Sequence, residues 1–158
     1  MNIEIYTDGS CSGNPGVGGY AGILLCNGQR RIVKGFSTDV RTTNNSMELK
    51  AIRESIGWLN KFQKKPCNVT IYTDSKYVID CATGKNKDGS KRTVGWFKGR
   101  KNEGLRVEFI TEVMKGKHTI TFVKVKGHSG VPLNEEANAM AQEECTRAKH
   151  ELVKGAVR

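Results

Sequence analysis

The chain has 158 residues, 37% of them hydrophobic and 27% charged, and 26 Lys and Arg against 16 Asp and Glu give a formal net charge of +10. This length and composition suit one globular domain and exclude a wholly disordered or fibrous protein. The positive excess favours a polyanionic partner, most often nucleic acid, and no apolar stretch is long enough to predict a membrane span.

Three strands open the chain. Residues 2–8 alternate as a half-buried strand does, and a glycine-rich turn over 9–16 follows. Residues 19–27 and 30–38 then read as two strands on either side of Asn27-Gly28, a pair typical of tight β-hairpins.

Helices and strands then alternate to the end of the chain. We predict helices over 46–61, 75–81, 105–115 and 132–152, and strands over 68–74 and 119–126. The last helix has a periodic face made of Ala137, Ala141, Cys145, Ala148 and Leu152. This order predicts a mixed α/β sheet covered by helices in a single domain over 1–158, with a tail over 153–158 that frays.

A basic segment over about 84–103 separates the second and third predicted helices. Asp88 is the only acid between Lys85 and Lys101. The bases of that window are Lys85, Lys87, Lys91, Arg92, Lys98, Arg100 and Lys101. One interpretation is a solvated loop, but we favour a protrusion that grips nucleic acid, because bases displace counterions from phosphates and Trp96 can pack on a sugar or base.

A short sequence segment occurs twice and indicates a ligand-binding site. Ile5-Tyr6-Thr7-Asp8 recurs as Ile71-Tyr72-Thr73-Asp74, so two strands end in the same phase with an Asp. If these strands are parallel neighbours, Asp8 and Asp74 converge at their carboxyl ends, where ligand sites of open α/β sheets form. Paired carboxylates repel unless a divalent cation such as Mg²⁺ or Mn²⁺ lies between them. The alternative is that each Asp only caps the following turn.

Three further polar residues have two interpretations each. Glu48 lies at the edge of its helix's apolar stripe and is either a third oxygen ligand or an acid favoured by the helix dipole. His128, in a glycine-flanked loop, is either a proton carrier near neutral pH or an exposed loop residue. Asn138, judged on the sequence pattern alone, is an ordinary polar helix residue.

The five cysteines give no pattern of pairing. Their number is odd and no two form a Cys-x-x-Cys pair. A zinc site or a disulfide framework is therefore poorly supported, and a reducing cytoplasm fits best.

Taken together, the motifs of residues 2–150 strongly resemble the type 1 ribonuclease H family in its bacterial form. The motifs that carry the resemblance are Tyr6-Thr7-Asp8-Gly9-Ser10-Cys11, Gly13-Asn14-Pro15-Gly16 with Gly18-Gly19-Tyr20, Thr42-Thr43-Asn44-Asn45 with Met47-Glu48-Leu49, Thr73-Asp74-Ser75 with Tyr77-Val78, Val125-Lys126-Gly127-His128, and Asn134-Glu135. The resemblance implies a ribonuclease H-like fold: a five-stranded mixed sheet of order 3-2-1-4-5 flanked by helices.

The resemblance also implies an activity, the endonucleolytic hydrolysis of the RNA strand of RNA/DNA hybrids by a two-metal mechanism. The products would carry 5′-phosphate and 3′-hydroxyl ends. Members hold two Mg²⁺ ions with four acids, of which Asp8 matches the bridging Asp, and Glu48 and Asp74 match the ligands of the second metal. His128 matches a loop His that assists proton transfer or product release.

Substrate contacts are carried over from the family in the same way. Asn14, Asn44 and Asn45 match residues that touch RNA 2′-hydroxyls or the minor groove. Arg41 and Thr43 match a pocket for a phosphate of the DNA strand. The segment 84–103 matches the basic handle of bacterial forms, and a monomer is expected.

The chain departs from the family pattern at the fourth acid. That acid belongs ten residues after the loop His, and here the residue is Asn138. An amide oxygen can touch a cation but brings no charge, so we predict strongly reduced turnover with hybrid binding largely spared. The residue is either a natural variant or an engineered Asp→Asn change that traps substrate, and the conservative shape of the swap favours the second interpretation.

Two other function classes stay open beside the nuclease. One is a hybrid-binding module without hydrolysis, which the clustered acids argue against. The other is a related polynucleotidyl transferase or junction nuclease on the same fold, which the three Asn residues argue against.

Overall fold

The computed structural model describes residues 1–90, 92, 97–126 and 130–157, without the side chains of 156 and 157. Five strands form one sheet of order β3-β2-β1-β4-β5, which confirms the expected fold class. The strands are β1 (Asn2–Cys11), β2 (Gly16–Cys26), β3 (Gln29–Thr42), β4 (Asn68–Thr73) and β5 (Thr119–Lys124). β1, β2 and β3 pair antiparallel, whereas β4 pairs parallel to both β1 and β5.

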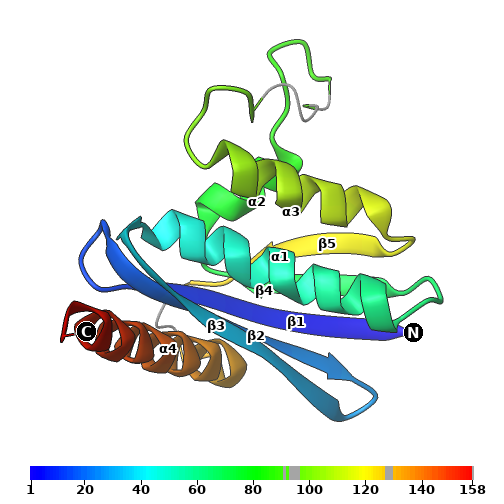
Figure 1. Cartoon of the computed structure of the whole chain (residues 1–158). Coiled ribbons are helices and arrows are strands. Elements are labelled where there is room, and N and C mark those ends of the chain that lie inside the picture. Colours follow the sequence, from blue (N-terminus) through cyan, green and yellow to red (C-terminus); the bar gives the residue numbers. More distant parts are fainter. Residues whose placement is uncertain (91, 93–96, 127–129, 158) are drawn as a thin grey trace.

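Four helices accompany the sheet in the part of the chain that the structure describes. They are α1 (Asn44–Phe62), α2 (Lys76–Thr83), α3 (Glu103–Lys115) and α4 (Pro132–Val157). α1 packs on one face of the sheet with α3 beside it, and α4 covers the other face across β1, β2 and β3 (Figure 1). None of the described helices has both the length and the apolar character of a membrane span.

The β2–β3 hairpin forms as Asn27-Gly28 predicts. Both residues have positive φ, +50° for Asn27 and +77° for Gly28, which a two-residue turn of this type requires. Cys26 pairs with Gln29 directly across the turn. β2 and β3 are each longer than predicted, as is β1, which continues through Cys11 into the segment predicted as a glycine-rich turn.

The main core lies between the sheet and α1. Ile5 and Ile71 from the sheet and Leu49, Ile52 and Ile56 from α1 are fully buried in one apolar cluster. α1 begins after Thr43, whose hydroxyl accepts a hydrogen bond from the Ser46 N–H, while the Ser46 hydroxyl accepts one from the Thr43 N–H. This reciprocal cap fixes where α1 starts, two residues earlier than predicted.

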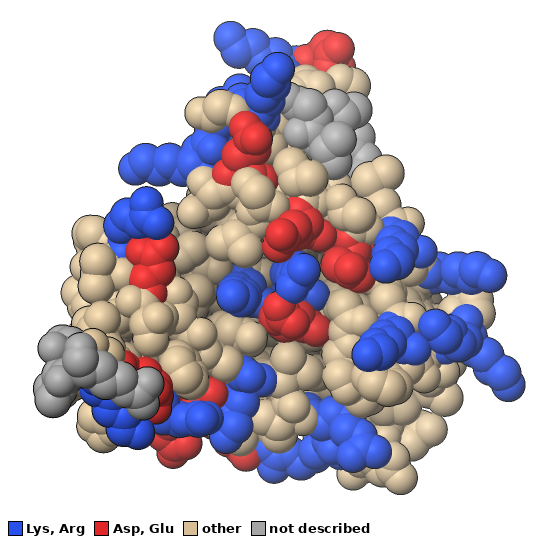
Figure 2. Space-filling model, in the orientation of Figure 1, with Lys and Arg blue, Asp and Glu red and all other residues tan. Residues whose placement is uncertain are grey.

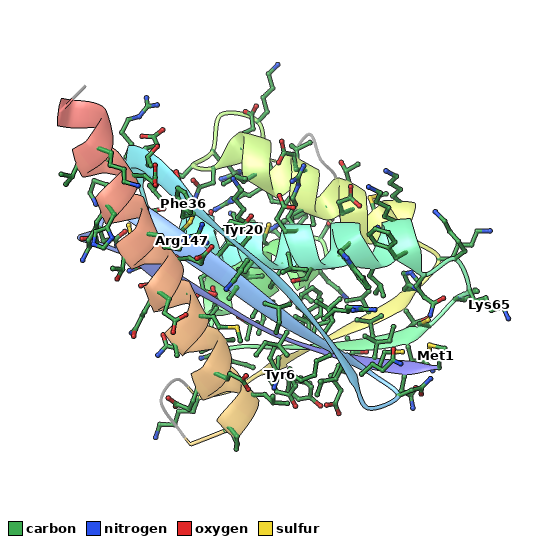
Figure 3. All side chains as sticks on the ribbon, turned by 60° about the horizontal axis from the view of Figure 1, so that its bottom comes forward. Met1, Tyr6, Tyr20, Phe36, Lys65 and Arg147 are labelled. Carbon is green, nitrogen blue, oxygen red and sulfur yellow. The ribbon has the colours of Figure 1, made fainter. Side chains whose placement is uncertain are left out.

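A second apolar layer joins the sheet to α4. Of its predicted face, Ala137, Ala141, Cys145 and Ala148 are buried, whereas Leu152 is 41% exposed. Tyr6 packs beneath the start of α4, and Phe36, Tyr20 and Arg147 lie together where α4 crosses the strands (Figure 3). The helix runs through residue 157, and the fraying of the predicted tail stays a prediction.

Candidate active site

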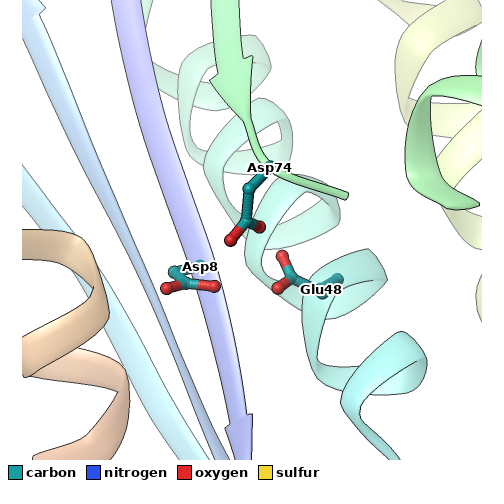
Figure 4. A group of neighbouring side chains, drawn as sticks. All are labelled: Asp8, Glu48 and Asp74. Atoms are coloured by element: carbon teal, nitrogen blue, oxygen red, sulfur yellow. The ribbon is translucent and has the colours of Figure 1, made fainter. Parts of the chain in front are cut away.

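Three carboxylates meet at one end of the sheet. Asp8 comes from β1, Glu48 from α1 and Asp74 from the residue that follows β4 (Figure 4). Each offers one oxygen atom, and these atoms all lie within 4.8 Å of one another. The structure thus brings together the three acids that the sequence singles out.

The parallel pairing of β1 and β4 explains the convergence of the two aspartates. Tyr6 pairs with Tyr72, and their rings stack with centroids 4.6 Å apart. Asp8 and Asp74 each lie two residues beyond that pair. The repeated segment therefore places Asp8 and Asp74 side by side, as predicted from the sequence.

Glu48 reaches the aspartates because Gly9 lets α1 approach β1 closely. A Cβ atom on Gly9 would lie 2.6 Å from the backbone nitrogen of Glu48 and 2.7 Å from the carbonyl carbon of Met47. No side chain of any size fits at that distance. The glycine after Asp8 thus sets the spacing between the strand and the helix that carries the third acid.

The cluster gathers three acidic groups, two of them buried and Asp74 half-buried. Asp8 is 5% exposed and Glu48 is 8% exposed. Burial, the negative charge of Asp8, a hydrogen bond with Asp8 and the charge of Asp74 together raise the pKa of the Glu48 carboxyl well above its ordinary value. The Oε2 atom of Glu48 is buried without a hydrogen-bond partner among the described residues. A buried oxygen without a donor is costly, and a hard divalent cation would satisfy it.

Two further residues were predicted to belong to the catalytic site, Asn138 and His128, and the structure describes only the first. Asn138 is a half-buried residue of α4, which packs on β1, the strand that carries Asp8. Asn134, one turn earlier, is 3% exposed and its Oδ1 lacks a partner in the described part of the chain. His128 lies outside the described residues.

Beyond the carboxylates, a hollow of about 420 Å³ opens beside the start of α1. Among the described residues, those that line it are polar, cationic or aromatic, apart from one proline, and none is an acid. They are Asn14, Pro15, Thr43, Asn45, Tyr77, Lys101, Asn102 and Arg106. The side chain of Asn14 accepts a hydrogen bond of 3.1 Å from the Asn44 N–H, which ties the β1–β2 loop to the helix start. Four residues predicted to contact substrate thus line one hollow, namely Asn14, Thr43, Asn45 and Lys101, and Asn44 lies next to it.

Arg41 lies at a neighbouring hollow of about 250 Å³ together with Thr42, Lys50 and Asn102. Its side chain is 86% exposed and is held by Asp39 through Nε–Oδ1 and Nη2–Oδ2 contacts of 3.1 and 3.0 Å. The hydroxyl of Thr43, predicted to share a phosphate pocket with Arg41, accepts the capping hydrogen bond of α1.

The basic segment over 84–103 is less uniform than predicted. The bases exposed to solvent in it are Lys85, Lys87, Lys98, Arg100 and Lys101. Figure 2 shows bases that project at the top of the molecule and others along its right edge and bottom. Arg92 is half-buried beside Cys81 and Phe97, and Phe97 is 1% exposed in the main core. Lys91 and Trp96 lie outside the described residues.

The two neighbouring hollows together are called the groove below. Three residues that line it were not predicted from the sequence, namely Tyr77, Asn102 and Arg106. Tyr77 was named only as part of the family motif Tyr77-Val78. Asn102 and Arg106 lie after Lys101, the last base of the predicted basic segment. One signal was available: Arg106 lies near the start of α3, where the helix dipole disfavours a cation. A base in that place needs another partner, and the structure shows that it contacts Tyr77.

Comparisons with known proteins agree with this geometry. Residues 1–146 match the family described as RNase H. The chain is 41% identical over 142 residues to the ribonuclease H of Caldicellulosiruptor saccharolyticus, covering 89% of this chain and 93% of that protein. It is also 41% identical over 150 residues to the ribonuclease H of Thermoanaerobacter sp. (strain X514), covering 92% and 90%.

Solved structures give the same answer for the fold. LC9-RNase H1, described as a type 1 RNase H with the type 2 active-site motif, superposes with a TM-score of 0.71 at 27% identity over 93% of this chain and 73% of that one. LC11-RNase H1, solved in complex with an RNA/DNA hybrid, superposes with a TM-score of 0.64 at 21% identity over 92% and 98%. The matched residues, the identity to the curated relatives and the clustered carboxylates all lead to one conclusion: the chain belongs to the ribonuclease H family.

Proposed function

We propose that this protein is a metal-dependent endoribonuclease that hydrolyses the RNA strand of RNA/DNA hybrids and leaves 5′-phosphate and 3′-hydroxyl ends. The observation that carries the proposal is a carboxylate cluster beside the 420 Å³ hollow, whose described lining residues include no acid. Asn44 and Asn45 lie four and three residues before Glu48 on α1, so one helix face joins the groove to the cluster. The relatives named ribonuclease H support the same activity.

The carboxylates of Asp8, Glu48 and Asp74 are the groups that would hold divalent cations. Oxygen-only ligands and the partnerless Oε2 of Glu48 fit two Mg²⁺ ions, with Mn²⁺ as a substitute. Cations bound there would supply a water of lowered pKa and stabilise the leaving oxygen. The protein's own part is to hold these carboxylates close together, with Asp8 and Glu48 buried.

The groove would bind and orient the hybrid. Asn14, Asn44 and Asn45 offer amide and backbone groups to the 2′-hydroxyl, which is the group that distinguishes RNA from DNA. Arg41 and Thr43 would hold a phosphate of the DNA strand. Such backbone contacts position the duplex without reading its sequence, so little sequence preference is expected.

The finer assignments belong to the same proposal. We place the protein in the bacterial form of type 1 enzymes, as a monomeric single domain whose basic handle, about residues 84–103, grips the duplex. His128 would carry a proton or assist product release. Asn138 would stand where the fourth acid belongs and offer only an amide oxygen, and reduced turnover for this reason stays a prediction.

The first test is cleavage of a labelled RNA/DNA hybrid in Mg²⁺ by the protein and its Asn138→Asp variant. We expect 5′-phosphate products from both and a faster rate for the variant, because a carboxylate adds charge at the metal site. Competition with duplex DNA and a four-way junction separates the other classes. Binding without cleavage by either form would indicate a hybrid-binding module, and preference for the junction would indicate a junction nuclease. Equal rates would refute the predicted impairment.

A further inference from the structure

A second polar cluster lies across the groove from the start of α1, where α2 and α3 meet. The hydroxyl of Tyr77 accepts a hydrogen bond of 2.7 Å from Nε of Arg106 and one of 3.1 Å from Nδ2 of Asn102. The guanidinium of Arg106 also lies over the rings of Tyr77 and Phe97, 4.7 and 5.7 Å from their centroids. Arg106 is thus held in one orientation by a hydroxyl and two aromatic rings.

The hydrogen bonds of this cluster leave the Tyr77 O–H and both terminal nitrogens of Arg106 without an acceptor among the described residues. A phenol oxygen accepts two hydrogen bonds and donates one. Tyr77 accepts two, and its O–H has no acceptor among the described residues. The terminal nitrogens of Arg106 likewise have no hydrogen-bond or ion-pair partner within that part of the chain. Asp80, which lines an adjoining hollow, is paired with Lys76 at 2.7 Å.

These donors border a hollow suited to an anion. Tyr77 and Arg106 line the 420 Å³ hollow together with Lys101, which adds a second positive charge. Asn14 and Asn45 also line it, and no carboxylate is among its described lining residues. One guanidinium held in place, an exposed lysine, a hydroxyl donor and amide groups match the charge and acceptor oxygens of a phosphodiester.

We propose that Arg106 and Tyr77 form a subsite for one backbone phosphate of the hybrid, with Asn102 as the residue that positions Tyr77. This inference rests on the proposed function and adds a contact to it, on α2 and α3 rather than on α1. The two aromatic rings hold the guanidinium of Arg106 and so lower the entropy lost when its planar fork binds phosphate. The subsite contributes affinity and register, not chemistry.

The test compares Arg106→Met with Arg31→Met, the same change at an exposed arginine near the other end of the sheet. Hybrid binding is measured against salt concentration in the Glu48→Gln background, where turnover is suppressed, and kcat and KM are measured in the parent. We expect Arg106→Met to weaken binding about fivefold and to lower the slope of log K against log salt by about 0.9, one phosphate contact. Arg31→Met should leave the slope unchanged, and kcat should stay within about twofold in both.

Tyr77→Phe provides a second, neutral probe. It keeps the ring and removes the hydroxyl, so we expect about two- to threefold weaker binding with an unchanged salt slope, because no charge is lost. Thermal melting confirms that each variant folds. An Arg106→Met variant that binds like Arg31→Met, or whose melting temperature and kcat fall together, overturns the subsite and leaves a structural role. If the parent neither binds nor cleaves the hybrid, the proposed function itself fails.

Discussion

The carboxylate cluster and the groove beside it are built in different ways. The cluster uses short side chains on paired strands and a packed helix, so the backbone fixes its geometry. The groove uses long side chains whose charged ends are exposed or held by other side chains, such as Arg41 by Asp39 and Arg106 by Tyr77. Changes in the cluster should therefore act on turnover in large steps, whereas changes in the groove should act on affinity in small ones.

The sharpest test of this difference is Asp8→Asn. The change keeps the shape of the side chain and removes one charge from the cluster, so we expect turnover in Mg²⁺ to fall by about three orders of magnitude, since several kcal/mol of transition-state stabilisation depend on a bound cation. Hybrid affinity should stay within about threefold. The measurements are cleavage rate and equilibrium binding, with Glu143→Gln on the exposed side of α4 as the control. A parallel loss of binding would contradict the division between cluster and groove.

Gly9→Ala tests whether the backbone sets the cluster's geometry. The new methyl group would lie 2.6 Å from the Glu48 nitrogen, so α1 must shift away from β1. We expect a loss of about 1–3 kcal/mol in the free energy of unfolding, the usual cost of overpacking, together with a large fall in turnover. Urea denaturation and cleavage assays measure both.

Gly104→Ala is the matched control for that change. A Cβ at Gly104 would meet nothing within 4 Å, and this residue lies inside α3. Alanine should therefore be neutral there or stabilise the protein by about 0.5–1 kcal/mol. Equal tolerance of alanine at both positions would show that the contact between β1 and α1 is loose.

The pH dependence of the free energy of unfolding tests the raised pKa of Glu48 in the cluster. The pKa of Glu48 is raised in the folded protein by burial and by Asp8 and Asp74. Without a metal, this residue's contribution to stability is fully present below its unfolded pKa of about 4.3 and is lost as pH rises through the folded pKa. Mg²⁺ should restore stability above that range, because it binds the charged form.

Glu48→Gln should remove this pH-dependent part. At neutral pH without metal we expect the variant to be more stable by roughly 1–3 kcal/mol, the scale of an unpaired buried polar group, and to gain less from Mg²⁺. Thermal melting between pH 4 and 8, with and without Mg²⁺, gives the answer. A parent whose melting temperature rises steadily with pH in the absence of metal would refute the assignment.

The difference between the carboxylate cluster and the groove also explains which features could be predicted from the sequence. The repeated Ile-Tyr-Thr-Asp segment placed Asp8 beside Asp74, because parallel strands with equal phase end at the same level. Asn27-Gly28 predicted the hairpin for an equally local reason. Features that backbone pattern determines were therefore accessible before the structure.

The groove was less predictable because it depends on contacts between side chains far apart in the chain. Tyr77 and Arg106 are 29 residues apart, and they meet only because the fold brings the start of α2 next to the start of α3. Arg92, counted among the bases of the predicted protrusion, is half-buried, and the nearby Phe97 is buried. Composition gave the sign of the surface charge, but it could not tell which bases are free and which are packed.

The smallest expected effect concerns the ion pair of Arg41. Asp39 binds this guanidinium through two contacts, and the arginine lowers the pKa of the Asp39 carboxyl, so the pair is charged throughout the neutral range. Both groups are exposed, and such pairs are weak in water. Asp39→Asn removes a negative charge beside a proposed phosphate pocket, so hybrid binding should tighten, by no more than about twofold at low salt and less at high salt.

Binding titrations at two salt concentrations measure this effect, with Glu143→Gln as a control for loss of one negative charge far from the groove. If Asp39→Asn weakens binding instead, the carboxylate holds Arg41 in the orientation that phosphate requires. In that case the groove would be preorganised at Arg41 as it is at Arg106. The groove would then differ from the carboxylate cluster only in how far its side chains are exposed to solvent.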